Sequence, residues 1–131
     1  MNDVDLKEYL GMPIWHSNDI EDMSTFTGFN KIYFKTMMQR QNKVEFSGIQ
    51  ESLMWAEKNP EHDFASMNPY KARHNNKDIY KYLYLFNKEM SNMEYDESLY
   101  TEDYWDKDPD EQEEWDDYVR ATIEKREKEK G

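Results

Sequence analysis

Three alternating aspartates have the spacing of the first ligands in a calcium-binding loop. Asp106, Asp108 and Asp110 would take its first, third and fifth positions, and Asp117 would take the twelfth. The sixth position of such a loop requires glycine for a sharp turn, but here it is Glu111, and a proline stands at the fourth. The pattern therefore does not predict a calcium loop, and we expect neither a bound metal nor a cofactor.

The other reactive side chains form no catalytic pattern. The chain has no cysteine, which excludes thiolate nucleophiles and Cys-ligated metals, and His16, His62 and His74 share no metal-binding spacing. No phosphate-binding loop, dinucleotide fingerprint or nucleophile elbow occurs. Many carboxylates are present, but no spacing selects an acid and base pair. These observations predict a protein that is not an enzyme.

The acidic residues are concentrated in one segment. The net charge is −12, and residues 94–117 alone contain 13 acidic residues and one basic residue. If this segment were helical throughout, it would place a carboxylate every ~2.8 Å, close to the ~3.4 Å between phosphates of one DNA strand. Such a surface could occupy a groove lined by Lys and Arg. The alternative is a solvated acidic run that only keeps the protein soluble.

Aromatic residues interrupt the acidic segment, and this favours binding over solubility. Solvating tails are poor in aromatic residues, whereas Tyr and Trp are enriched at interface hot spots. We predict that carboxylates mimic phosphates and that two aromatic residues anchor the partner. The predicted partner-binding residues are Asp103, Tyr104, Trp105, Asp106, Asp108, Asp110, Glu111, Glu113, Glu114, Asp116 and Asp117.

Residues 70–88 show the opposite charge pattern. Lys71, Arg73, Lys77, Lys81 and Lys88 alternate with tyrosines, a combination that can bind single-stranded nucleic acid through phosphate contacts and base stacking. The alternatives are an exposed face of an amphipathic helix, or a patch that docks the acidic segment internally. Because the whole chain is strongly acidic, we expect no direct nucleic-acid binding.

Hydrophobic periodicity predicts an all-α fold. The pattern predicts a short helix over 4–10, ended by Gly11 and Pro13, and an irregular stretch over 12–27 in which a turn of helix can start at Asn18. Further helices are expected over 29–42, from a capping box at Ser47 and Gln50 to Asn59, over 77–91, and from Asp108-Pro109 to about residue 128. A strand alternative applies to 31–34 and 80–86. We expect a compact helical domain over 1–93 and an acidic, aromatic-studded helical extension over 94–131.

Composition indicates the class of protein. The sequence shows neither a signal peptide nor an apolar run long enough to cross a membrane, so we expect a cytoplasmic protein without membrane contact. Abundant Asn, Lys, Tyr and Met are typical of AT-rich genomes such as those of many bacteriophages. In size and charge, though in no motif, the chain resembles the small acidic inhibitors that phages use against restriction enzymes and CRISPR effectors.

This resemblance implies a non-enzymatic inhibitor. It would bind a basic, nucleic-acid-handling or defence protein of the host by DNA mimicry. The alternative is a phage structural or assembly adaptor that docks on a basic partner.

Overall fold

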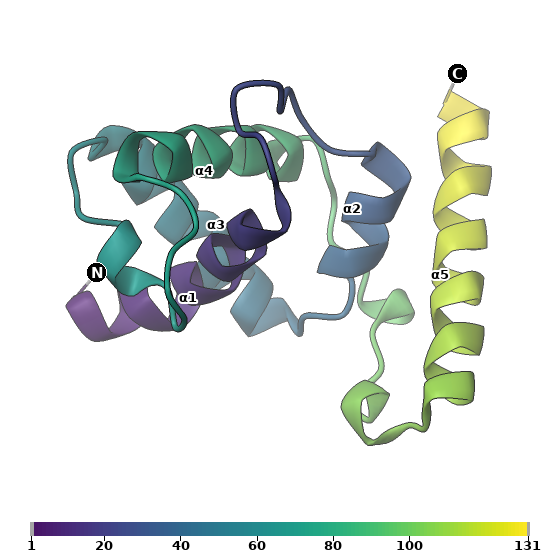
Figure 1. Ribbon diagram of the computed structural model, residues 1–131. Coiled ribbons are helices and arrows are strands. Elements are labelled where there is room, and N and C mark those ends of the chain that lie inside the picture. Colours follow the sequence, from purple (N-terminus) through teal and green to yellow (C-terminus); the bar gives the residue numbers. More distant parts are fainter. Residues whose placement is uncertain (1, 131) are drawn as a thin grey trace. The chain divides into compact units, whose positions relative to one another are not determined.

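The computed structural model describes residues 2–130, and within them every regular element is a helix (Figure 1). The all-α prediction is confirmed. The two segments with a strand alternative lie in α2 (Lys31–Met38) and α4 (Asn76–Ser91), so the helical interpretation was correct for both.

Asparagine and aspartate side chains begin the α-helices. Asn2 caps α1 (Asp3–His16), Asn30 caps α2 and Asn75 caps α4, each accepting a hydrogen bond from a backbone N–H three residues later. Asp108 caps α5 (Pro109–Lys130) through the amide of Glu111 at 2.9 Å, as the sequence predicted.

The start of α3 (Lys43–Lys58) was predicted too late. The capping box at Ser47 is not used, because Asn42 accepts from the amide of Glu45 at 2.8 Å and begins the helix earlier. The helix still ends just before the Asn-Pro step at residues 59–60.

The first helix is longer than predicted. α1 passes through Gly11 and Pro13 and ends at His16. Leu6, Leu10 and Ile14 are buried at intervals of four residues along it. This continuous apolar stripe stabilises the helix beyond the proline, whose own cost is one missing hydrogen bond and local crowding.

The structure divides into two compact units. The first contains described residues up to 28 together with 47–92, and the second contains 29–46 together with described residues from 93 onward. The first unit thus includes α1, most of α3 and α4. It also includes the short 3-10 helices η1 (Ser17–Asp19) and η2 (Ala65–Met67). A division into domains at residue 93 stays a prediction.

The core of the first unit is aromatic and aliphatic. Phe64 and Phe86 are fully buried, together with aliphatic residues of α1, α3 and α4. Gly48 lets the ring of Tyr9 lie directly on α3, because a Cβ at this position would overlap Tyr9 Cε1 and the ring would have to shift. The Cβ-less residue therefore permits close packing within this unit.

The second unit contains α2, two 3-10 helices, η3 (Glu97–Leu99) and η4 (Tyr104–Asp106), and α5. Figure 1 shows α2 and α5 side by side. The acidic segment is α-helical only from Pro109, so residues 94–108 do not continue the charge spacing of a regular helix. Within residues 2–130, no helix is both long and apolar enough to cross a membrane.

Candidate protein-interaction surface

One face of α5 packs against the rest of the second unit. Val119 and Ile123 are buried with Leu99 of η3, and Trp115 and Ile32 pack partly buried against them. Trp115, Val119 and Ile123 are spaced four residues apart, so they form a single stripe along the helix. This stripe defines the inner face of α5.

Hydrogen bonds to Asp116, about one turn before Val119, also hold this side of α5 against the rest of the unit. Arg40 donates two hydrogen bonds to Asp116, from Nη2 to Oδ2 at 3.0 Å and from Nε to Oδ1 at 3.4 Å. The hydroxyl of Tyr104 donates to Asp116 Oδ2 at 2.8 Å. Asp116 thus satisfies two donors from different parts of the unit, which draws its carboxylate inward.

The loop before α5 is tied to the helix at the same point. Gln112 donates from Nε2 to the backbone oxygen of Tyr104 at 2.9 Å, and the Arg40 guanidinium lies 5.3 Å from the centroid of the Tyr104 ring. Cation–π attraction and the two-point ion pair act together. We call Arg40, Tyr104, Gln112 and Asp116 the clasp.

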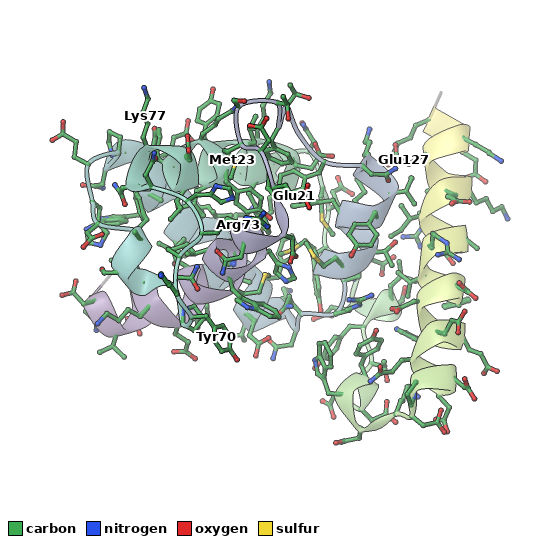
Figure 2. The ribbon with its side chains drawn as sticks, viewed as in Figure 1. Glu21, Met23, Tyr70, Arg73, Lys77 and Glu127 are labelled. Carbon is green, nitrogen blue, oxygen red and sulfur yellow. The ribbon has the colours of Figure 1, made fainter. Side chains whose placement is uncertain are left out.

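Ion pairs hold the other end of α5. Glu127 pairs with Lys31 at 3.2 Å and with Lys35 of α2, and its hydrogen bonds to these lysines lower the pKa of its carboxyl to about 2. Figure 2 labels Glu127 on α5. Arg126 pairs with Asp96, whose backbone also exchanges two hydrogen bonds with the amide of Gln39. The helix is therefore held at both ends.

Fixing the inner face determines which carboxylates point outward. Asp110, Glu113, Glu114 and Asp117 lie three, four and seven residues apart, so they share the face of α5 opposite the apolar stripe. All four are exposed. They lie within about 10 Å along the helix axis at a rise of ~1.5 Å per residue.

We define the acidic surface as the nine predicted site residues that are exposed. They are Asp103, Trp105, Asp106, Asp108, Asp110, Glu111, Glu113, Glu114 and Asp117. Asp106, Asp110, Glu111, Glu113 and Glu114 have no hydrogen-bond or ion-pair partner for their carboxylates within residues 2–130. These five charges are free to meet an external cation.

Other members of the acidic surface have local partners. Asp103 lies 3.5 Å from Lys107, and the pKa of its carboxyl is lowered mainly because the hydroxyl of Thr101 donates to it. Asp117 pairs with Arg120 of the next turn. The carboxylates of Asp103 and Asp117 remain 63% and 54% exposed, so neither pair removes its carboxylate from solvent.

Two predicted site residues are taken up inside the unit. Tyr104 is only 5% exposed, and burial together with its bond to Asp116 raises the pKa of its hydroxyl to about 12. Asp116 is the carboxylate of the clasp. Trp105, by contrast, is 69% exposed and stacks edge-on against Tyr104. The acidic surface therefore keeps one exposed tryptophan and loses two of the eleven predicted residues to the fold.

Sequence reasoning missed the basic side chains that hold the acidic segment. The internal partners of Asp116 and Glu127 are Arg40, Lys31 and Lys35, all from residues 29–46. That stretch has four bases and one acid, and Lys31 and Lys35 are spaced one helical turn apart. This local positive excess was the available signal.

The basic stretch 70–88 is partly used by the first unit. Lys81 donates to the backbone oxygen of Met23 at 2.7 Å, and Arg73 donates to that of Asn18 at 3.2 Å. Tyr80 donates to the backbone oxygen of Glu57 at 3.0 Å. In Figure 2, the Lys77 side chain extends away from α4. The alternation of bases and tyrosines thus partly reflects packing.

Comparisons of this chain with protein-family models, with curated proteins and with solved structures find no match.

Proposed function

We propose that this protein is a non-enzymatic inhibitor that binds a basic, nucleic-acid-handling protein through its acidic surface. The observation that supports this proposal is the outward row of carboxylates on α5, which lies opposite a face held by packing and by the clasp. A rigid array of negative charge can complement a Lys- and Arg-lined groove. Because the array is already ordered, little conformational entropy is lost on binding.

The charge density of the row supports mimicry of a nucleic acid backbone. Its four exposed carboxylates, Asp110, Glu113, Glu114 and Asp117, occupy about 10 Å of helix, a mean spacing comparable to one phosphate per ~3.4 Å of a single DNA strand. Trp105 is also exposed and is the proposed anchor. The proposed targets are restriction enzymes or CRISPR effectors in the cytoplasm of a phage host, and residues 94–131 form the proposed acidic extension.

The test begins with capture of the partner. Tagged protein is used to isolate binding proteins from bacterial extract, and each purified candidate is titrated with this protein in the presence of labelled duplex DNA. Mimicry predicts that the two compete for one site. A partner that binds both at once would exclude the mimicry proposal.

The same assay then maps the contact. A variant with Asp110→Asn, Glu113→Gln, Glu114→Gln and Asp117→Asn should compete at least tenfold more weakly, a loss of about 1.4 kcal/mol or more. A control variant with Asp3→Asn, Glu8→Gln, Glu51→Gln and Glu61→Gln changes the net charge equally at exposed positions of the other unit. Equal weakening by both variants would assign the effect to net charge alone.

A second candidate function is a phage structural or assembly adaptor. Trp105 and Tyr118 are 69% and 55% exposed, and exposed aromatic side chains favour a protein partner of any kind. This reading predicts capture of virion proteins and no competition with DNA.

A further inference from the structure

An exposed aromatic ring lies on α5 next to the outward carboxylates. Tyr118 is 55% exposed, and its ring centroid lies 5.4 Å from that of Trp115, three residues earlier. Long side chains on a helix lean toward its N-terminus, so the Tyr118 ring covers the turn before its own Cα. Trp115 itself packs against the buried apolar cluster of this unit. The contact between the two rings therefore holds Tyr118 in place on the surface.

Two carboxylates share this flank of the helix. Glu111, Glu114 and Tyr118 follow one another at intervals of three and four residues, so they lie on one side of α5 with neighbouring Cβ atoms about 5–6 Å apart. Both glutamates are exposed, and neither carboxylate has a hydrogen-bond or ion-pair partner within residues 2–130. Within the same residues, no cationic side chain lies over the Tyr118 ring. The flank thus presents carboxylates and an aromatic ring side by side to a group from outside.

The clasp shows which cation such a combination can hold. There, the Arg40 guanidinium donates to Asp116 at 3.0 Å and lies 5.3 Å from the centroid of the Tyr104 ring. One planar cation therefore bonds to a carboxylate and contacts a tyrosine ring at the same time. The ammonium group of lysine is a compact, strongly hydrated charge without a flat face to lay on the ring. A carboxylate beside a tyrosine thus favours arginine over lysine.

We propose that Tyr118 is a specificity-determining residue that makes the acidic surface select arginine rather than lysine side chains of its partner. An arginine that bonds to Glu114 can lay its guanidinium against the Tyr118 ring, because the two side chains are neighbours on the helix. Glu111, one turn earlier, can receive a second arginine. This inference rests on the proposed function, since it names the chemistry by which the acidic surface recognises a basic partner.

The experiment compares two peptides of equal charge, capped hexa-arginine and capped hexa-lysine. Each is titrated into the intact protein at the same salt concentration. Calorimetry measures the affinity, and the indole N–H signal of Trp115 in NMR spectra reports binding at this flank. The arginine peptide should bind more tightly by a factor of about three or more, the size of one exposed cation–π contact, and should shift the Trp115 signal further at saturation.

Variants assign the preference to the aromatic ring. Tyr118→Leu keeps an apolar side chain at an exposed position, so the fold should persist, which circular dichroism checks. It should lower the ratio of arginine-peptide to lysine-peptide affinity about threefold. Tyr118→Phe keeps the ring and should retain most of the ratio. The matched control Tyr33→Leu removes another exposed tyrosine of the same unit, and should leave the ratio unchanged.

The outcomes separate this inference from the proposed function. Equal binding of the two peptides, or an equal effect of Tyr118→Leu and Tyr33→Leu on the ratio, overturns the role of Tyr118 and leaves the acidic surface as the interface. If neither peptide binds, or if the quadruple carboxylate variant described above binds both as tightly as the parent protein, the acidic surface does not receive basic side chains and both proposals fail.

Discussion

The guanidinium of Arg40 and the carboxylate of Asp116 form a two-point ion pair between residues 76 positions apart in the sequence. The two side chains are 26% and 21% exposed, so the pair is partly shielded from water. It turns one carboxylate of a dense acidic run inward, while its neighbours Glu114 and Asp117 remain outside. The predictions below follow from this arrangement.

Replacing Arg40 by Met should destabilise the second unit by about 1–3 kcal/mol, because Asp116 loses a charged donor in a partly buried place. Urea unfolding monitored by circular dichroism measures the change. The control is Arg120→Met, which breaks only the exposed pair with Asp117 and should shift stability by less than about 0.5 kcal/mol. Equal effects of the two variants would contradict a structural role for the clasp.

Removing the Tyr104 hydroxyl should change how the free energy of unfolding depends on pH above pH ~10. The pKa of Tyr104 is raised to about 12, so the folded protein favours the neutral hydroxyl. Its contribution is complete below pH ~10 and is lost as the pH rises from about 10 to 12. Tyr104→Phe should therefore be less stable near neutral pH and lose less stability over that range. Burial also raises the pKa of Tyr95 to about 12. The Tyr104→Phe variant should therefore still lose some stability between pH ~10 and ~12.

Acid should weaken the attachment of the C-terminal half of α5. The pKa of Glu127 is lowered to about 2, so its contribution is present above pH ~4.5 and is lost as the pH falls from about 4.5 to 2. In Glu127→Gln, thermal unfolding between these pH values should depend less on pH than in the parent protein. Thermal unfolding of the variant should still depend partly on pH through Asp96, because Ser98 and Arg126 lower the pKa of its carboxyl. An unchanged pH profile in the variant would rule out this role of Glu127.

The two tryptophans of the second unit should differ in fluorescence. Trp105 is 69% exposed, whereas Trp115 packs against the cluster of Leu99, Val119 and Ile123. The emission lost in Trp105→Phe should be red-shifted and strongly quenched by iodide, and that lost in Trp115→Phe should be blue-shifted and weakly quenched. Similar quenching of both would mean that α5 does not pack on this cluster in solution.

Complex formation with the captured partner should weaken steeply with salt. Exposed charges beyond ~8 Å are screened at physiological ionic strength, so a contact made by the acidic surface depends on low screening. Binding measured by calorimetry from low to high sodium chloride gives the slope. A slope near zero would indicate that apolar contacts dominate, and the acidic surface would then not be the principal interface.

The sequence by itself determined the local features of this protein. Apolar spacing identified the helix that became α4, and Asp108 followed by proline identified the start of the last helix. These features are readable because caps and helical periodicity act over only a few residues. The excess of acid in 94–117 is likewise a property of the sequence alone.

Tertiary structure decided how the acidic residues are used. Nothing in local spacing separates Asp116 from Asp117, yet the first binds Arg40 and Tyr104 while the second faces solvent. Burial of Leu10 and Ile14 also extends α1 past Pro13, although the local sequence predicted that the helix would end at residue 10. Both outcomes depend on contacts between residues distant in sequence, where packing and paired charges outweigh local preference.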